Sequence, residues 1–299
     1  MQVIDPLRPE LFRYCRSLAG SLWDAEDLVQ DTLLRAFAKL ADVHWQIDNP
    51  RAYLFRMATN LWIDRSRRPG ESIMPEQVDA PAPAAPPPGD VREAMQTMAR
   101  LLPPQERAAL LLKDVFDFTL AEIAAQLRTS QGAVKAALHR GRERLAEATR
   151  DRDEREMAGR PTQRAHAPAA VLLEKWCAAF NARDLQGLAN LMLEDAEADV
   201  VGVVQEYGRA QIRDGSFKHT IFDEEGEPRA ELRHFRGEPL VILWYTTEPG
   251  VRRVRDLLRF IEADGGLRSL RYYYFCPETL AEVCRELNLP LKDNGYRYM

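Results

Sequence analysis

Apolar residues recur at the spacing of amphipathic helices through the first half of the chain. In NPRAYLFRMATNLWIDRSRR, Asn49 is placed to cap a helix that has Pro50 at its first position. In LPPQERAALLL, Pro103 and Pro104 likewise precede an apolar helix. The pattern predicts an all-α structure for residues 5–69 and 91–150. The expected buried positions are Leu28, Val29, Thr32, Leu33, Ala36, Phe37 and Leu40 in the helix before Asn49, and Leu54, Met57, Ala58 and Leu61 in the helix after it.

A short helix, a tight turn and a second helix are expected between Leu120 and Leu145. Leu120–Leu127 forms the first helix, Arg128 and Thr129 make the turn, and Ser130 caps the second helix. This order, with cations on the outer face, is typical of a recognition helix in the major groove, and a solvated basic helix is the alternative. The inward face is expected to hold Val134, Leu138, Gly141 and Leu145, and the outer face Gly132, Lys135, Ala136, His139 and Arg140, flanked by Arg142 and Arg144.

The last part of the chain changes to the pattern of β-strands. Five segments dense in Val, Ile, Tyr and Phe predict a run of antiparallel strands, with hairpin turns at residues 236–238 and 264–266. Helices are expected at Ala169–Phe180 and Asp184–Leu193 before the strands, and at Glu278–Leu287 after them. The strand segments are ADVVGVVQEYG, RAELRHF, EPLVILWYTT, RDLLRFIEA and LRSLRYYYF.

Two segments separate these blocks. Residues 70–90 are rich in Pro and Ala and poor in large apolar side chains, which predicts an extended linker. Residues 151–168 are a charged run that ends in Gly and Pro. We therefore expect domains at 1–69, 91–150 and 169–299, joined by linkers at 70–90 and 151–168.

Composition narrows the class of protein. The 299 residues carry a net charge of −5, so a nucleic-acid surface must be a local patch. No apolar run reaches the roughly 20 residues of a membrane span, and no signal peptide is recognised at the N-terminus. The scattered cysteines Cys15, Cys177, Cys276 and Cys284 show no metal-ligand spacing, so we expect reduced thiols, a cytoplasmic protein and neither metal nor cofactor.

Two helix faces in the first block suggest binding partners. Asp27, Gln30, Asp31 and Leu34 share the face opposite the buried stripe, and a leucine exposed among carboxylates favours a protein partner. On the next helix, the rings of Tyr53, Phe55 and Trp62 alternate with arginines. That alternation suits unstacked bases and phosphates, although core aromatics beside a basic helix end are an equal alternative.

The order of these pieces resembles the extracytoplasmic-function sigma factors of bacteria. The matching stretches are DAEDLVQDTLLRAF, NPRAYLFRMATNLWIDRSRR, LPPQERAALLLKDVFDFTLAEIAAQL and GAVKAALHRGRERL. The resemblance implies that the helix 24–40 binds core RNA polymerase, that the helix 49–68 and the loop 42–48 open the −10 promoter element, and that the helix-turn-helix reads the −35 element. The implied DNA-binding residues are Arg51, Tyr53, Arg56, Asn60, Trp62, Arg65, Arg67, Gln131, Lys135, His139, Arg140 and Arg142.

The chain departs from that family at three places. Relatives have Gly and a branched apolar residue where this chain has Arg128 and Thr129, which puts the geometry of the turn in question. They often have Ser-Arg in place of Ala136-Ala137, and Arg in place of Thr59. These last two changes remove expected phosphate contacts.

The third block resembles the SnoaL-like members of the nuclear-transport-factor fold, an α+β cone-shaped barrel. LEKWCAAFNARDLQGLANLMLEDAEADVVGVV and LRSLRYYYFCPE carry the resemblance. It implies a regulatory domain, and the short tether between this block and the sigma domains leads us to expect an intramolecular contact between them. Other readings are a ligand pocket walled by Trp176, Phe180, Trp244 and Tyr272–Tyr274, an ordinary aromatic core, and an enzyme with candidates Asp199, His219, His234, Tyr245 and Tyr273.

These observations lead to a non-enzymatic sigma factor that binds core RNA polymerase and promoter DNA and carries a fused regulatory domain. One rival is a transcription regulator that works without polymerase and senses a ligand through its C-terminal domain. The other rival is turnover of a small hydrophobic substrate by residues 169–299.

Overall fold

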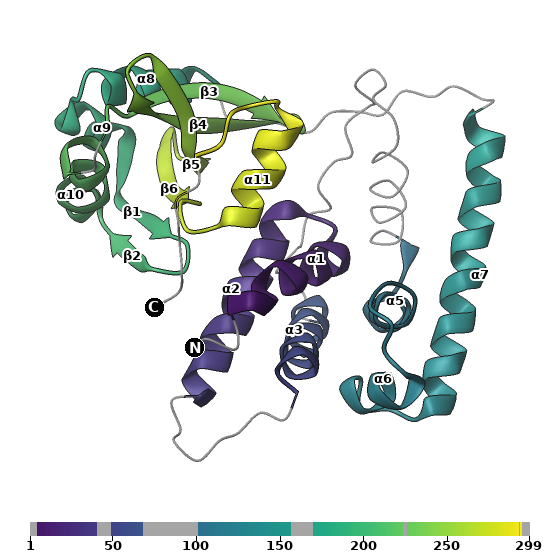
Figure 1. Ribbon diagram of the computed structural model, residues 1–299. Helices are drawn as coiled ribbons and strands as arrows, with labels where there is room; N and C mark the ends of the chain where they lie inside the picture. Colours follow the sequence, from purple (N-terminus) through teal and green to yellow (C-terminus); the bar gives the residue numbers. More distant parts are fainter. Residues whose placement is uncertain are drawn as a thin grey trace. The chain divides into compact units, whose positions relative to one another are not determined.

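The computed structural model describes residues 5–40, 49–67, 101–156, 170–223, 226–292 and 294. The expected linker 70–90 and the loop 42–48 lie outside the described residues. The chain divides into two compact units, Met1–Gln163 with Tyr298–Met299, and Arg164–Arg297. The first unit is helical and the second is built on a sheet, so the two halves have the architectures that their periodicities predict (Figure 1).

The first unit begins with three packed helices, α1 (Arg8–Ala19), α2 (Leu22–Leu40) and α3 (Pro50–Ser66), after a short turn η1 (Asp5–Leu7). Asn49 caps α3 by accepting a hydrogen bond from the backbone N–H of Ala52, which confirms the predicted start of this helix. Most of the predicted stripe residues of α2 are buried, and Phe37 is half-buried. Helical periodicity therefore identifies the inner face of α2 correctly.

The described part of the first unit also contains α5 (Pro104–Leu110), η2 (Leu111–Val115), α6 (Leu120–Gln126) and α7 (Gln131–Glu156). Pro104 stands in the first turn of α5, as predicted. The helix α7 continues through Glu156, six residues into the segment predicted as a linker from residue 151. The start of this charged run is therefore helical, which composition alone did not reveal.

The second unit contains a six-stranded sheet in the order β2-β1-β6-β5-β4-β3. The strands are β1 (Met192–Val200), β2 (Val204–Tyr207), β3 (Arg229–Phe235), β4 (Glu238–Glu248), β5 (Val251–Ala263) and β6 (Gly266–Tyr272). Contrary to the expected antiparallel run, β1 pairs with β6 in parallel. The chain reaches this pairing because the β3–β4–β5–β6 meander brings its last strand back beside the first.

Two tight hairpin turns fix the register of the meander. Arg236 and Gly237 have φ values of 52° and 80°, and Asp264 and Gly265 have φ values of 52° and 77°. Positive φ at both central residues suits a two-residue hairpin loop, because its twist matches that of the strands. Both predicted turns are therefore confirmed.

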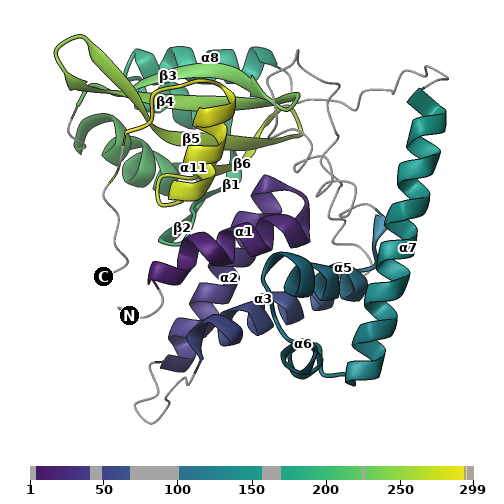
Figure 2. The same cartoon turned by 45° about the vertical axis from the view of Figure 1, so that its right-hand side comes forward.

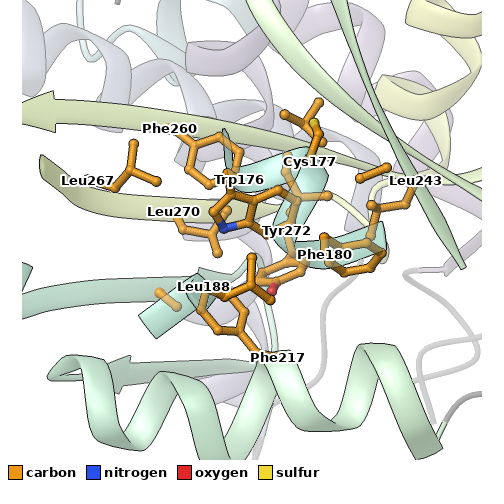
Figure 3. Close-up of a cluster of buried hydrophobic side chains, with 14 of the residues drawn as sticks. Trp176, Cys177, Phe180, Leu188, Phe217, Leu243, Phe260, Leu267, Leu270 and Tyr272 are labelled. Carbon is orange, nitrogen blue, oxygen red and sulfur yellow. The ribbon is translucent and has the colours of Figure 1, made fainter. Parts of the chain in front are cut away.

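Helices pack on the sheet of the second unit. They are α8 (Ala170–Asn181), α9 (Leu185–Leu191), α10 (Arg209–Ile212), η3 (Arg213–Phe217), η4 (His219–Asp223) and α11 (Pro277–Glu286). The helical segment 209–223 has no counterpart in the sequence prediction. Figure 3 shows the core between α8 and the sheet, where the ring of Trp176 stacks on Phe180 with centroids 5.1 Å apart and meets Phe260 at the same distance.

The first unit contains a buried ion pair that generates a stability prediction. Arg8 Nη2 donates to Glu26 Oε1 at 2.7 Å, and Gln30 Nε2 donates to the same oxygen at 2.9 Å. Glu26→Ala should lower the free energy of unfolding by about 3–5 kcal/mol, because it leaves a buried cation without its carboxylate. Chemical denaturation followed by far-UV circular dichroism measures the change. The double variant Arg8→Met/Glu26→Leu should recover most of the loss, and a loss below about 1 kcal/mol for Glu26→Ala would contradict the role of this pair.

Candidate nucleic-acid and protein interfaces

The aromatic residues of α3 do not form one exposed surface. Trp62 is only 3% exposed, and Phe55 is buried and stacks on Tyr14 with ring centroids 4.4 Å apart. Tyr53 is half-buried, and burial raises the pKa of its hydroxyl. Phe55 and Trp62 therefore contribute to the core, the alternative that the sequence left open, and stacking of Trp62 on a base requires this part of the protein to open.

The cations of α3 fall into two groups. Arg51 pairs with Glu10 at 2.6 Å, and Arg65 pairs with Asp31. Arg56 and Arg67 are exposed, and Asn60 is half-buried. Phosphate binding by the first two arginines would compete with a carboxylate of this chain, while the exposed arginines can meet a phosphate directly.

The turn of the helix-turn-helix is well formed despite its unusual sequence. Arg128 has a φ of 52°, the left-handed region that glycine adopts most easily. The backbone N–H of Thr129 donates to the carbonyl of Ala124 at 2.9 Å, and Ser130 accepts from the N–H of Ala133 at 3.1 Å. A capping box between Thr119 and Glu122 starts α6. Arg128 thus closes the turn in a conformation that strains a residue other than glycine.

The faces of α7 follow the prediction. Val134, Leu138 and Gly141 are buried. A Cβ at Gly141 would lie 2.7 Å from Leu110 Cδ1, so α5 and α7 approach closely at this position. The outer residues of the predicted recognition surface are exposed: Gln131, Gly132, Lys135, Ala136, His139, Arg140 and Arg142.

Carboxylates hold the later arginines of α7. The buried carboxylate of Glu106 accepts from Arg140 Nε at 2.9 Å and also from Arg144, and Asp114 accepts from Arg142 at 2.7 Å. Sequence reasoning missed Glu106 and Asp114 because they lie 28 to 38 residues from their partners, where no helical period relates them. The ion pairs fix the arginines beside the exposed face, whereas Lys135 extends from its centre.

The predicted protein-binding face of α2 is only partly present. Leu34 is 57% exposed, and Asp27 and Asp31 are half-buried beside it. Gln30 is buried and bonded to Glu26, so its assignment to this face is wrong. Gln30 points inward because it lies four residues after Glu26, within reach of the buried ion pair.

The residues proposed to wall a pocket in the second unit lie on two faces of the sheet. Trp176, Phe180 and Tyr272 belong to the core beneath α8. Trp244 alternates with the core residues Leu243 and Tyr245, and its Nε1 donates to Glu231 at 2.8 Å. Tyr273, which follows Tyr272 at the end of β6, hydrogen-bonds the side chain of Arg259. These aromatics therefore do not line a single cavity.

The candidate enzymatic residues are dispersed. Asp199 accepts from Arg271 Nε at 3.0 Å, His219 lies 3.7 Å from Asp223 in η4, and His234 is exposed on β3. Tyr245 is buried beneath the guanidinium of Arg255, 4.9 Å from the ring centroid. Asp199, His219 and Tyr245 each contact a different neighbour, and His234 is exposed, so the candidates do not form one site.

Among the residues that the structure describes, no group of three or more His, Cys, Asp or Glu side chains could hold a metal ion. Within the same ranges, no helix is long and apolar enough to cross a membrane.

Comparison with known proteins assigns each half of the first unit to a protein family. Residues 3–71 match the family described as Sigma-70 region 2, and residues 92–145 match Sigma-70, region 4. The extracytoplasmic-function (ECF) RNA polymerase sigma factor SigG of Mycobacterium tuberculosis is 33% identical over 222 residues, which cover 64% of this chain and 58% of that protein. The ECF sigma factor SigF of Caulobacter vibrioides is 36% identical over 146 residues, which cover 47% of this chain and 79% of that protein. The chain thus spans little more than half the length of SigG.

Solved structures with similarity to this chain include sigma factors and sheet proteins. The Mycobacterium tuberculosis extracytoplasmic-function sigma factor SigJ has a TM-score of 0.34 at 22% identity, with 91% of this chain and 95% of that one covered. An NTF2-like protein of unknown function from Cytophaga hutchinsonii has a TM-score of 0.27 at 10% identity, with 37% of this chain and 93% of that one covered.

Proposed function

Because the chain belongs to the ECF family of RNA polymerase sigma factors, we propose that it binds core RNA polymerase, recognises a promoter and initiates transcription in the cytoplasm. The observation that carries the proposal is the exposed face of α7, with Lys135 at its centre, in a chain that matches both sigma-70 region 2 and region 4. A regulator independent of polymerase would not need the region 2 match. Co-purification with core polymerase separates these two functions.

The first residues of α7 are proposed to read base edges, and its later cations to bind phosphate. A helix that enters the major groove presents its N-terminal residues to the bases, so Gln131 and Lys135 take the reading positions. Arg140 and Arg142 lie one to two turns further along, beside the carboxylates Glu106 and Asp114. These ion pairs orient the arginines before DNA arrives, and exchange of carboxylate for phosphate keeps the charge balanced.

The α2 face around Leu34 is proposed to bind the polymerase. Leu34 is a large apolar side chain in a largely solvent-exposed position, and the half-buried carboxylates Asp27 and Asp31 border it. An apolar contact ringed by charges can combine affinity with a defined orientation. The proposed domains are region 2 at 1–69, region 4 at 91–150, with α7 continuing to Glu156, and a third domain at 169–299.

The third domain is proposed to be a SnoaL-like regulatory domain without catalytic activity. Its candidates Asp199 and His219 are engaged in separate contacts, with Arg271 and Asp223. Aromatic side chains fill the space beneath α8, as Figure 3 shows for Trp176, Phe180 and Phe260. Incubation of the full-length protein with small ketones and esters should show no turnover, whereas turnover abolished by a Tyr245 or Asp199 variant would favour the enzyme.

The polymerase assignment predicts the effect of one charge. Leu34→Arg should weaken binding to core polymerase at least tenfold, about 1.4 kcal/mol, because it places a cation in an apolar contact. The melting temperature should not change, since the side chain is already largely in water. Val171→Arg alters an equally exposed apolar residue of α8 and serves as the control. Equal polymerase affinities for the two variants would exclude this face.

The DNA assignment predicts different effects for two cations of α7. Lys135→Ala should cost about 1–3 kcal/mol at one base pair of the −35 element and relax the preference there. Arg140→Ala should weaken all sequences alike and reduce the salt slope by about one. Titrations of polymerase holoenzyme on promoter variants at several salt concentrations measure both. Unchanged binding for both variants would show that another element reads the DNA.

The regulatory assignment predicts the effect of truncation. Ending the chain after Glu156, where α7 ends, should raise run-off transcription several-fold. The tethered third domain has an effective concentration of order millimolar, so even weak contacts with the sigma domains can restrain them. An internal control is circular dichroism showing intact helices in the truncated chain. Equal transcription from both chains over a range of concentrations would make the third domain an independent module.

A further inference from the structure

The turn between α6 and α7 carries a cation in a strained conformation. Arg128 has a φ of 52°, in the left-handed region that glycine adopts easily and larger residues avoid. Its side chain is exposed, as are the residues between it and the start of α7. Figure 2 shows this turn as the short connection between α6 and the lower end of α7. Since the conformation costs energy for a residue other than glycine, we expect the arginine side chain to make a contact that offsets the cost.

The turn does not depend on the guanidinium of Arg128. Backbone hydrogen bonds close it, from the N–H of Thr129 to the carbonyl oxygen of Ala124 at 2.9 Å and from the N–H of Val134 to that of Ser130 at 3.0 Å. Within the described part of the chain, the Arg128 side chain has no hydrogen-bond or ion-pair partner. Its positive charge is therefore not balanced by any described carboxylate.

Other arginines of this chain show how a structural role differs. Arg236 has the same φ of 52° in the turn between β3 and β4, but it donates to Glu282 at 2.7 Å and to Glu286 at 2.9 Å. These ion pairs account for an arginine in that turn. The later arginines of α7 likewise lie against carboxylates. Arg128 has neither kind of contact, so a structural ion pair does not explain it.

Cations lie on both sides of the residues that are proposed to read bases. Arg128 precedes Gln131 by three residues, so their Cα atoms are at most about 11 Å apart at 3.8 Å per residue. Arg140 follows Gln131 by nine residues, about 14 Å along the helix at 1.5 Å per residue. The major groove of B-DNA is about 12 Å wide, with a phosphate backbone along each edge. A helix that places Lys135 at the centre of the groove therefore brings Arg128 and Arg140 to opposite edges.

We propose that Arg128 binds a DNA phosphate at one edge of the major groove of the −35 element, on the strand opposite to the one that Arg140 contacts. The inference rests on the proposed function of α7 and adds a phosphate contact that the turn supplies. An exposed guanidinium can make two parallel charge-assisted hydrogen bonds to a phosphate, and such a contact fixes position without reading sequence. Contacts to both strands set the depth and angle at which α7 enters the groove.

The test uses holoenzyme assembled from core polymerase and the full-length protein, on duplexes that the parent holoenzyme selects from a random DNA pool. Arg128→Gln keeps a long polar side chain but removes its charge. It should weaken binding to all selected duplexes alike, about three- to tenfold, and make the slope of log K against log salt concentration shallower by about 0.9. Arg128→Lys should restore most of the slope, whereas a merely structural role would leave the slope insensitive to the charge at this position.

A second measurement assigns the strand. Uncharged methylphosphonate groups replace the phosphates of the −35 element one at a time on each strand. Replacement of the phosphate that Arg128 contacts should weaken the parent holoenzyme but not the Arg128→Gln holoenzyme, because the same contact cannot be lost twice. The corresponding phosphate for Arg140→Ala should lie on the other strand.

The matched control is Arg183→Gln. Arg183 is an exposed arginine with a φ of 56° in the turn between α8 and α9, so its replacement should leave affinity and slope unchanged. If circular dichroism shows that Arg128→Gln has lost its fold, Arg128→Gly decides, because glycine adopts this φ without strain. An unchanged slope for the Arg128 variant beside a reduced slope for Arg140→Ala, or both phosphates on one strand, would overturn this inference alone. Failure of the parent holoenzyme to select any duplex would overturn the proposed function, and this contact with it.

Discussion

The surface of α7 that is proposed to read DNA depends on the close approach of α5 and α7 at Gly141. A side chain at this position would collide with Leu110, so only glycine permits the two helices to approach so closely. Glu106 lies buried at the crossing and binds Arg140 and Arg144, which fixes the rotation of α7 about its axis. That rotation decides which residues face water. Lys135 and His139 are exposed because Val134 and Leu138, on the adjoining face, are locked inside.

Ion pairs between arginines and carboxylates occur in both halves of the helical unit. Arg51, Arg65, Arg140 and Arg142 each pair with a carboxylate of the chain, so the charge of these side chains is balanced locally. In water such pairs contribute little stability. Their larger effect is on orientation: in the proposed complex, a guanidinium already held by a carboxylate would lose less freedom when phosphate replaces that carboxylate. The exposed cations would supply the electrostatic attraction for a first encounter with DNA.

The helix α3, which is proposed to contact DNA, buries aromatic side chains in a core that it shares with region 4. Trp62 and Phe55 complete a core shared with region 4, and Arg107 caps a helix of region 2. The third domain instead closes its own core around Trp176 and needs no partner to bury its aromatics.

The sequence by itself determined the local structure. Periodicity identified the inner faces of α2 and α7, capping residues identified the start of α3, and Gly237 and Gly265 marked the hairpins, because each of these depends on neighbours within a few residues. Tertiary structure decided the rest. Whether Trp62 stacks on a base or lies in a core, whether Gln30 faces water, and which carboxylate holds Arg140 all depend on side chains distant in sequence. The parallel pairing of β1 with β6 has the same origin. Which strands become neighbours depends on how the whole sheet packs on its helices, and no local sequence pattern determines it.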